Sequence, residues 1–421
     1  MTTLPKQLPV QPWMTAPETQ AVVAALTRDG GQVRFVGGCV RDALLGREVR
    51  DVDLATPDPP QVVVERLEAA GIRAIPTGIE HGTVTAVVGE KHFEITTLRR
   101  DVENFGRRAR VAFTADWDAD AARRDFTINA LSAEPDGTLH DPFGGLADLA
   151  AGRVRFVGEP ETRIREDVLR LLRFFRFHAY YGRGAPDAAA LDACARLADL
   201  LPTLSGERIA GETTRLMLAP DPASAIELMT ETGVLPHVLP EFTEVARLRF
   251  LVVIEDDLGD RDSLRRMAAL IPAGAVDRAR DVARRLRLSN ADAERLAAMV
   301  GPPIRVTPDL DAHERRRALH RLGAPLFRDL VLLDWAESAG DATGHRELLA
   351  EAATWTPVVL PVRGQDVLDL GIPPGPEVGR LITAVEQWWE ANDYRPGRAE
   401  CLERLRQLAR PPAGDAGREA T

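Results

Sequence analysis

The stretch that decides the fold is Arg34–Thr56, which reads RFVGGCVRDALLGREVRDVDLAT. Its first three residues predict the end of a strand, Gly37 and Gly38 predict a sharp turn, and the residues after them predict a short helix. Adjacent glycines let backbone N–H groups approach a ligand, and the start of a helix favours an anion. Arg41 falls in the first turn of that helix, where a guanidinium can bind a phosphate in a fork. The turn therefore predicts a phosphate-binding site.

Two aspartates, Asp51 and Asp53, occupy alternate positions of a second predicted strand. Alternate side chains of a strand face the same way, about 7 Å apart. Two such carboxylates can share divalent cations, and hard oxygen ligands suit Mg²⁺. Each feature alone is also typical of an ordinary turn or of a solvated strand edge. Together they predict two-metal phosphoryl transfer.

The combination of strand, Gly-Gly turn, helix and Asp-x-Asp resembles the nucleotidyltransferase signature of the DNA polymerase beta superfamily. The version here, GGCVRDALLGREVRDVD, is similar to that of class II tRNA nucleotidyltransferases and their poly(A) polymerase relatives. The segments TGIEHGTVTAVVGEKHFEITTLRRD (77–101) and RRDFTINAL (123–131) carry the same resemblance. The Gly-Arg-Arg-Phe-like segment typical of poly(A) polymerases is not found in this region of the sequence.

The composition is that of an ordinary globular protein, with 45% hydrophobic and 28% charged residues among 421. This length predicts two to four domains. Three widely separated cysteines form no disulfide framework or zinc pattern, which fits a reducing cytoplasm. The N-terminal residues show no signal pattern, and no run approaches the roughly 18 apolar residues of a membrane helix. We therefore expect a cytoplasmic protein with no membrane partner.

The net charge of −11 argues against a protein that coats nucleic acid over its whole surface. Local basic patches can still bind RNA. Of the 53 basic residues only Lys6 and Lys91 are lysine. Because that skew reflects composition as a whole, only the placement of the arginines indicates function.

The order of predicted elements gives the fold class: an α/β head, with a twisted sheet of the nucleotidyltransferase type and helices, followed by an all-α neck, body and tail. The predicted head helices are 16–29 and 59–70, and its later strands are 72–76, 82–88 and 92–98. We expect these domains: head 1–150, neck with a nucleotide-selecting helix 151–225, body 226–355, tRNA-contacting tail 356–410 and disordered tail 411–421.

Glu94 lies in the last predicted strand of the head. On a central strand it would complete the metal site or accept the proton of the attacking hydroxyl, whereas on an edge strand it would be an ordinary surface residue. The segment that follows, 100–122, has many charges and no sustained periodicity, which predicts a long mobile loop. Loops of that length are uncommon unless they are functional.

A predicted helix, Glu166–Tyr181, places Asp167, Arg170, Arg173 and Arg176 at every third position. They form a spiral stripe with leucines and phenylalanines between them. A solvated face would mix acids and lysines, so one acid with three arginines among aromatics is typical of a recognition surface. The stripe resembles the family's nucleotide-selecting motif, Glu-Asp-x-x-Arg.

The resemblance implies addition of C, C and A to the 3′ end of tRNA from CTP and ATP without a template. The site residues it implies are catalytic Asp51, Asp53 and Glu94, with Asp51 and Asp53 as ligands of Mg²⁺, and nucleotide-binding Gly37, Gly38, Arg41, Arg123, Arg124, Asp167, Arg170, Arg173 and Arg176. The implied partners are the acceptor stem and 3′ end of tRNA.

Base chemistry supports the selecting role of Asp167 and Arg170. Cytosine and adenine both present an amino donor beside a ring-nitrogen acceptor, whereas uracil and guanine present the reverse. A fixed carboxylate and guanidinium therefore accept C and A and leave polar groups unpaired with U and G.

The alternatives are a poly(A) polymerase, an enzyme that adds only CC or only A, and an inactive RNA-binding module. The sequence gives no oligomeric state.

Overall fold

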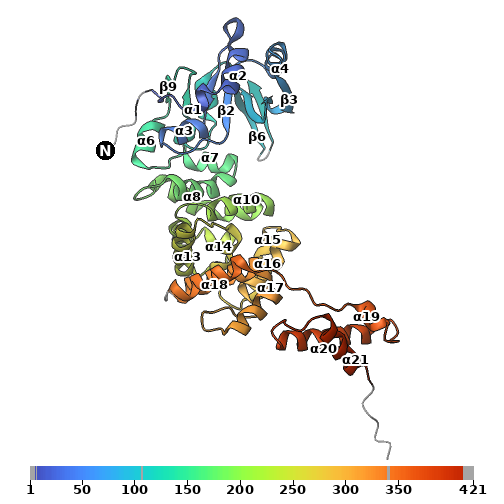
Figure 1. Cartoon of the computed structure of the whole chain (residues 1–421). Coiled ribbons are helices and arrows are strands. Elements are labelled where there is room, and N and C mark those ends of the chain that lie inside the picture. The colour runs from blue at the N-terminus through green and yellow to red at the C-terminus, as the bar shows by residue number, and fades with distance from the viewer. Residues whose placement is uncertain (1–4, 6, 106–107, 339–341, 411–421) are drawn as a thin grey trace, which may run out of the picture.

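The chain is elongated, with a mixed α/β head at one end, stacked helices in the middle and a helical tail at the other end (Figure 1). This computed structural model describes residue 5 and residues 7–105, 108–338 and 342–410, without the side chains of 101–111. The predicted fold class is confirmed. The predicted disordered tail, 411–421, lies outside the described residues. Within the described part of the chain, each helix is too short or too polar to cross a membrane.

The head is built on a seven-stranded sheet of order β3-β4-β5-β2-β1-β8-β9. The strands are β1 (Arg34–Val36), β2 (Val52–Thr56), β3 (Arg73–Gly78), β4 (Thr83–Val88), β5 (Lys91–Thr97), β8 (Ser132–Ala133) and β9 (Leu139–His140). Only the β2–β5 pair is parallel among the pairings of these strands. Leu54 and Ile95 are buried on these two central strands, so Asp53 and Glu94, one position earlier, face the opposite side of the sheet.

Short helices surround this sheet. They are α1 (Pro12–Thr15), α2 (Pro17–Thr27), α3 (Gly38–Leu44), α4 (Pro60–Ala69), α5 (Trp117–Ala122) and α6 (Gly145–Ala151), with 3₁₀ turns at Arg28–Gly30, Ile79–His81 and Thr127–Asn129. The helix α4 packs on β3, β4 and β5, and α3 packs on β1 and β2. The predicted turn is present: Gly37 has φ +69° and directly precedes α3.

The prediction of a mobile loop over 100–122 is wrong in its secondary structure. β6 (Arg99–Phe105) and β7 (Arg108–Phe113) pair with each other in a separate antiparallel sheet, and α5 follows. A hairpin that pairs only with itself needs no regular apolar face, which explains why the sequence shows no period. The helix α5 begins at a cap, because the Asp116 carboxylate accepts hydrogen bonds from the amides of Asp118 and Ala119 at 2.9 and 3.2 Å.

The predicted helix 166–181 is broken in two. α7 (Pro160–Glu166) ends before Asp167, whose backbone is extended at φ −150° and ψ 106°, and α8 (Leu169–Tyr181) begins after Val168. The Asp167 carboxylate accepts a hydrogen bond from the Leu169 amide at 3.1 Å. Aspartate competes with helix formation in this way and favours positions before a helix. Asp167 therefore lies beside the arginine stripe of α8 instead of on it.

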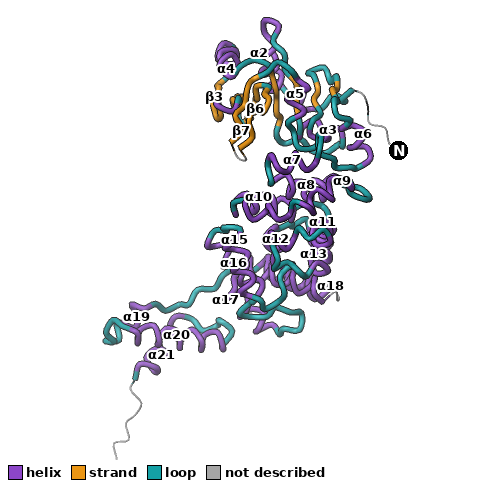
Figure 2. The backbone as a smooth tube through the Cα atoms, turned by 180° about the vertical axis from the view of Figure 1, so that it is seen from behind, coloured by secondary structure: helices purple, strands orange, loops and turns teal. Residues whose placement is uncertain are grey.

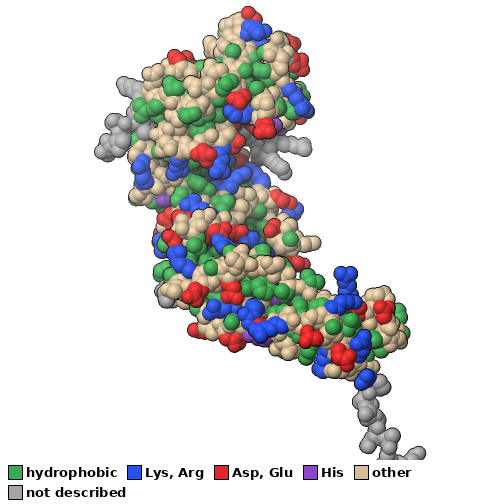
Figure 3. Space-filling view, viewed as in Figure 1, with side chains coloured by type: hydrophobic (Ala, Val, Ile, Leu, Met, Phe, Trp, Pro, Cys, Tyr) green, Lys and Arg blue, Asp and Glu red, His purple; other side chains and the backbone are tan. Residues whose placement is uncertain are grey.

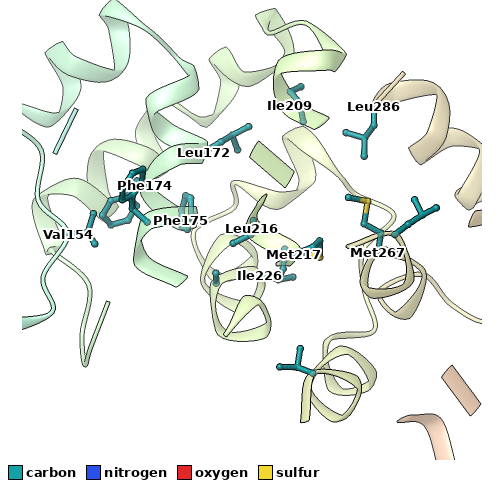
Figure 4. Packing of buried hydrophobic residues seen from close by; sticks show 14 of the residues in the cluster. Val154, Leu172, Phe174, Phe175, Ile209, Leu216, Met217, Ile226, Met267 and Leu286 are labelled. Carbon is teal, nitrogen blue, oxygen red and sulfur yellow. The ribbon is translucent and has the colours of Figure 1, made fainter. Parts of the chain in front are cut away.

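Helices make up the rest of the chain (Figure 2). They are α9 (Ala188–Arg196), α10 (Gly206–Met217), α11 (Pro222–Glu231), α12 (Leu235–Val238), α13 (Val245–Leu258), α14 (Ser263–Ala269), α15 (Val276–Arg285), α16 (Asn290–Val300), α17 (Ala312–Ser338), α18 (Ala342–Thr354), α19 (Gly364–Leu368), α20 (Pro376–Ala391) and α21 (Arg398–Ala409), with a 3₁₀ segment at Ala198–Thr203. One apolar core runs from the head sheet to α18. Figure 4 shows how Phe175, Leu216 and Met267 continue it from α8 through α10 to α14.

The tail has a core of its own, formed by residues such as Val367, Leu381 and Leu405. It contacts the first half of α17 through ion pairs, among them Arg316 with Asp393 at 2.6 Å. α17 bends at Gly323, where φ is +74°. His320 of α17 also contacts the rings of Trp389 and Tyr394. The tail is therefore joined to the body by ion pairs and ring contacts, not by the shared apolar core.

Four body helices are joined by a buried ionic network. Glu255 of α13 is fully buried and accepts hydrogen bonds from Nε of Arg265 at 2.7 Å and of Arg266 at 2.5 Å, both on α14. Arg265 also contacts Asp329 of α17 at 2.9 Å, and Arg295 of α16 binds the same carboxylate at 2.8 Å. Buried guanidiniums need such partners, because an unpaired buried charge is costly.

We predict that Glu255→Gln lowers the free energy of unfolding by about 3–5 kcal/mol, since Arg266 loses its buried carboxylate partner and Arg265 loses one of its carboxylate partners. Urea denaturation followed by circular dichroism measures the change. The control is Asp277→Asn, which breaks an exposed pair with Arg280 on α15 and should change stability by about 1 kcal/mol or less. Equal effects of the two substitutions would contradict the prediction.

Candidate active site

A cavity of about 950 Å³ lies where the head meets α8 and α10. Its wall consists of Gly37, Gly38, Arg41, Asp53, Glu94, Arg99, Arg123, Arg124, Asp125, Asn129, Asp167, Leu169, Arg170, Arg173, Phe177, Arg208 and Arg215. Figure 3 shows basic side chains gathered at this junction. The cavity therefore brings together two carboxylates of the head sheet and arginines from segments far apart in the sequence.

Parallel pairing of β2 and β5 places Asp53 directly opposite Glu94. Opposite residues of paired strands carry their side chains on the same face. Asp51 comes just before β2 and is exposed, but its charge still acts on Asp53. The described residues provide no hydrogen bond or ion pair for the carboxylate of Asp51, Asp53 or Glu94. Asp53 and Glu94 therefore line the cavity together, within reach of the charge of Asp51, with no protein cation bound directly to their carboxylates among the described residues.

Burial is the main cause that raises the pKa of Asp53, from its ordinary value of 3.8 to about 6. The charges of Glu94 and Asp51 raise this pKa further, while Arg124 opposes the shift. A partly buried carboxylate near two other negative charges is unfavourable until a cation neutralises it.

The donor set fits a divalent metal ion, because hard carboxylate oxygens without a protein cation are the ligands that such ions prefer. Among the described residues there is no cluster of three or more acidic, His or Cys side chains close enough to hold a metal by itself. Mg²⁺ is commonly held by one or two carboxylates together with substrate phosphates. Asp51 and Asp53 therefore fit a metal that binds together with a nucleotide.

Asp120 of α5 holds both predicted triphosphate arginines. Its carboxylate accepts hydrogen bonds from Arg123 Nε at 2.8 Å and from Arg124 Nη2 at 3.2 Å. Burial alone would raise the pKa of Asp120, but these two guanidiniums outweigh it and lower the pKa. Both arginines directly follow the last residue of α5.

A second network surrounds Asn129, which lies in the 3₁₀ turn Thr127–Asn129 that follows α5. Its amide oxygen accepts a hydrogen bond from Arg41 Nη1 at 2.5 Å, and its amide nitrogen donates to Asp125 at 2.9 Å. Asp125 in turn binds Arg173 of α8 through Nε at 2.7 Å. Burial would raise the pKa of Asp125, but Arg173 and the hydrogen bonds from Asn129 and the Phe126 amide lower it. This chain of contacts links the Gly-Gly turn to the arginine stripe.

Arg41 is buried, and three of its N–H groups already have partners: Asn129, and the carboxylate of Asp42 at 3.0 and 2.7 Å. Its guanidinium also lies 4.2 Å from the ring centre of Tyr181 on α8. The remaining N–H groups on its two terminal nitrogens are available to a ligand in the cavity. Binding of a triphosphate by Arg41 stays a prediction.

The two residues predicted to select the base, Asp167 and Arg170, are held by different partners. Arg170 Nη1 donates to Glu166 at 2.6 Å and to the Arg163 carbonyl at 3.1 Å, and its Nη2 donates to the Arg123 carbonyl at 3.2 Å. Asp167 is bound by a residue of α10, Arg208, whose Nη2 lies 2.9 Å from each carboxylate oxygen.

Two predicted residues do not line the cavity. Asp51 lies just outside its wall, and Arg176 points to α10, where it forms an ion pair of 2.6 Å with Glu212. Both side chains of that pair are largely buried. Arg176 therefore joins α8 to α10 in this structure, and its nucleotide-binding role stays a prediction.

Sequence reasoning missed Asp120, Asp125 and Arg208. The first could have been found, because Asp120 precedes Arg123 and Arg124 by three and four residues, the spacing of neighbours on a helix. Asp125 stands inside the segment RRDFTINAL but pairs 48 residues away. Arg208 has no signal in the sequence, because its partner Asp167 lies 41 residues away on another element.

Two family models match the chain in this order: the Poly A polymerase head domain over residues 33–155, and the Probable RNA and SrmB- binding site of polymerase A over residues 186–245. The CCA tRNA nucleotidyltransferase 1, mitochondrial, of Mus musculus is 33% identical over 92% of this chain and 89% of its own length. The chain belongs to the CCA tRNA nucleotidyltransferase family.

Other members support the same assignment. The CCA-adding enzyme of Geobacillus stearothermophilus is 33% identical over 89% of this chain and 92% of its own length. The crystal structure of the Bacillus stearothermophilus CCA-adding enzyme in complex with CTP aligns with a TM-score of 0.78 and 28% identity, over 95% of this chain and 98% of that one. Family membership implies a divalent metal, which the carboxylates of this site fit.

We predict that Asp53→Asn stabilises the metal-free protein. Because the folded-state pKa of Asp53 is raised, the folded chain holds that proton more tightly, and ionisation removes stability as pH rises from 3.8 to about 6. At pH 7–8 in EDTA the variant should gain about 1–3 kcal/mol in the free energy of unfolding. Below pH 3 the two proteins should be equally stable. A variant that is less stable than wild type at pH 8 would refute this reading of the site.

Proposed function

We propose that the chain adds C, C and A to the 3′ end of tRNA from CTP and ATP by nucleotidyl transfer, releasing diphosphate. The observation that carries the proposal is the single cavity shared by Asp53 and Glu94 of the head with Asp167 and Arg170 of the neck. One cavity thus contains both the acidic groups for transfer and the groups that distinguish bases. An inactive RNA-binding module would need neither set.

The arginines of the wall provide the binding site for the triphosphate. Arg123 and Arg124 are oriented by Asp120 and Arg41 by Asn129, so their spare N–H groups are preorganised for phosphate oxygens. Gly37, with φ +69°, leaves room where a Cβ atom would come within 3.0 Å of Arg124. This is the role that the Gly-Gly turn has in the proposal.

In the transfer step the terminal hydroxyl of tRNA attacks the α-phosphorus of the nucleotide. The bond between that phosphorus and the bridging oxygen breaks, and diphosphate leaves. Asp51 and Asp53 would hold Mg²⁺, which supplies charge neutralisation for the phosphate oxygens when it is bound. Glu94, opposite Asp53 in the sheet, is the proposed acceptor of the hydroxyl proton. The remaining barrier is lowered by holding the two reactants in line.

Base selection is assigned to Asp167 and Arg170. Asp167 accepts from the amino group of C or A, and Arg170 donates to the adjacent ring nitrogen. Arg173 and Arg176 belong to the same predicted set. Arg173 lines the cavity and is paired with Asp125. Arg176 is paired with Glu212 and joins α8 to α10 outside the cavity wall.

The neck, body and tail are proposed to bind the acceptor stem of tRNA by shape and phosphate contacts, without reading bases. The domain limits 1–150, 151–225, 226–355 and 356–410 remain part of the proposal, and the separate core of the tail supports the last boundary.

A reducing compartment is proposed because all three cysteines are buried and unpaired. The cytoplasm fits this, although the Mus musculus relative is named as mitochondrial.

The test is to incubate the protein with Mg²⁺ and tRNA that lacks its 3′ CCA, and to size the products at single-nucleotide resolution. CTP alone should add two nucleotides, ATP alone none, and both together three. A poly(A) polymerase would instead extend the RNA repeatedly with ATP. An enzyme that adds only CC would stop after two nucleotides with both substrates present. An enzyme that adds only A would need tRNA that already ends in CC.

The controls for this experiment are Asp51→Ala and Asp53→Ala. Either change should abolish addition with any nucleotide, because the metal-binding carboxylates are lost, while affinity for tRNA in a filter-binding assay changes little. Incorporation close to that of wild type by either variant would overturn the assignment of the metal ligands.

We predict that Asp167→Ala narrows the preference for CTP over UTP. Loss of one good base-edge contact costs about 1–3 kcal/mol of discrimination, a factor of roughly 5–150. The measurement is the ratio of kcat/KM for CTP to that for UTP in wild type and variant. If overall activity falls while this ratio stays the same, Asp167 has only a structural role at the start of α8.

A further inference from the structure

Asp167 has few constraints of its own. It lies in the two-residue break between α7 and α8, where its backbone is extended. From its own segment only the Leu169 amide, at 3.1 Å, contacts its carboxylate. Arg170, by contrast, is held at 2.6–3.2 Å by Glu166 and by the carbonyls of Arg163 and Arg123. A base-selecting pair needs both members fixed, so Asp167 requires a second support.

Arg208 provides that support from a different helix. Its Nη2 lies 2.9 Å from both oxygens of Asp167, so this nitrogen, together with the Leu169 amide on Oδ1, holds the carboxylate in one orientation. A carboxylate has about four acceptor positions. Contacts from Arg208 and the Leu169 amide leave at least one of them free for the amino group of a base. The contact therefore orients Asp167 without using up its capacity to accept.

The position of Arg208 is set by the packing of α10 against α8. Four residues further along α10, on the same face, Glu212 forms its ion pair with Arg176. Ile209 and Leu216 of α10 pack into the same core as Leu172 of α8 (Figure 4). The two helices are thus held in register by a buried pair and by apolar packing, and this register brings Arg208 to Asp167.

Solvent reaches the Asp167–Arg208 pair from two sides. Both residues line the large cavity, and both also line a smaller one of about 280 Å³ beside Ser205. Their side chains are 29% and 25% exposed. Ion pairs exposed in this way contribute little to folding stability. The position and geometry of the pair point to an orienting role more than to a stabilising one.

We propose that Arg208 is a positioning residue that fixes the Asp167 carboxylate for base selection, and so determines how strongly C and A are preferred over U and G. This inference rests on the proposed function. It identifies a specificity-determining group on α10, outside the segment that contacts the base.

The test compares Arg208→Ala and Arg208→Lys with wild type in single-nucleotide addition to tRNA lacking CCA. In Arg208→Ala, kcat/KM for CTP should fall while that for UTP hardly changes, so their ratio should drop by roughly 5- to 100-fold. The lysine variant should recover much of the ratio, because the observed contact uses a single nitrogen. Thermal unfolding should be nearly unchanged in both variants.

The matched control is Glu207→Gln, at the residue of α10 next to Arg208. It removes an exposed ion pair between Glu207 and Arg287 and should leave the ratio of CTP to UTP use unaltered. An equal fall for CTP and UTP in Arg208→Ala would overturn the proposal, since it indicates a structural role only. A rise in CTP use would also overturn it, because Arg208 would then compete with the base. Absence of CTP preference in wild type would instead contradict the proposed function itself.

Discussion

Guanidinium groups crowd one cavity of this protein, and the carboxylates behind them make that crowding possible. Uncompensated like charges would repel one another and destabilise the junction of head and neck. Asp120 holds two of the arginines, Asp125 holds Arg173, and Asp167 is paired with Arg208. Each acid neutralises part of the charge and fixes a donor in place. In the proposed function a triphosphate would meet donors that are already oriented, so its binding would need little reorganisation.

Asp53 and Glu94, the two head-sheet carboxylates of the cavity, have no such partner of opposite charge in the part of the chain that the structure describes. Asp53 is partly buried beside Glu94, its carboxylate has no hydrogen-bond or ion-pair partner among the described residues, and its pKa is raised to about 6. The structure thus accepts a destabilising group at a position where the bound metal and nucleotide would neutralise it. Such local losses are expected at functional sites and are offset by packing elsewhere. Here the continuous core from the head sheet to α18 provides that packing.

Much of the architecture follows from local sequence. The Gly-Gly turn, the strand that carries Asp53 and the limits of α2 and α4 depend on neighbouring residues, so pattern and propensity suffice to predict them to within a few residues. The hairpin after β5 was not predicted, because its strands pair only with each other. The break at Asp167 was not predicted either, because a capping hydrogen bond outweighed the helical pattern. The Arg208 contact depends on the packing of α10 against α8, which no local pattern encodes.

The cations of the cavity wall are all arginine, and this has a consequence for chemical modification. Lys91, the lysine within the described residues, is paired with Glu18 on the head surface and does not line the cavity. Acetylation of lysine, which removes a positive charge, therefore has no target among the described residues of the cavity wall. Guanidinium groups also stay protonated throughout the range in which lysines begin to titrate. The cavity keeps its charge under alkaline conditions and towards amine-directed reagents, and only reagents that attack guanidinium can neutralise it.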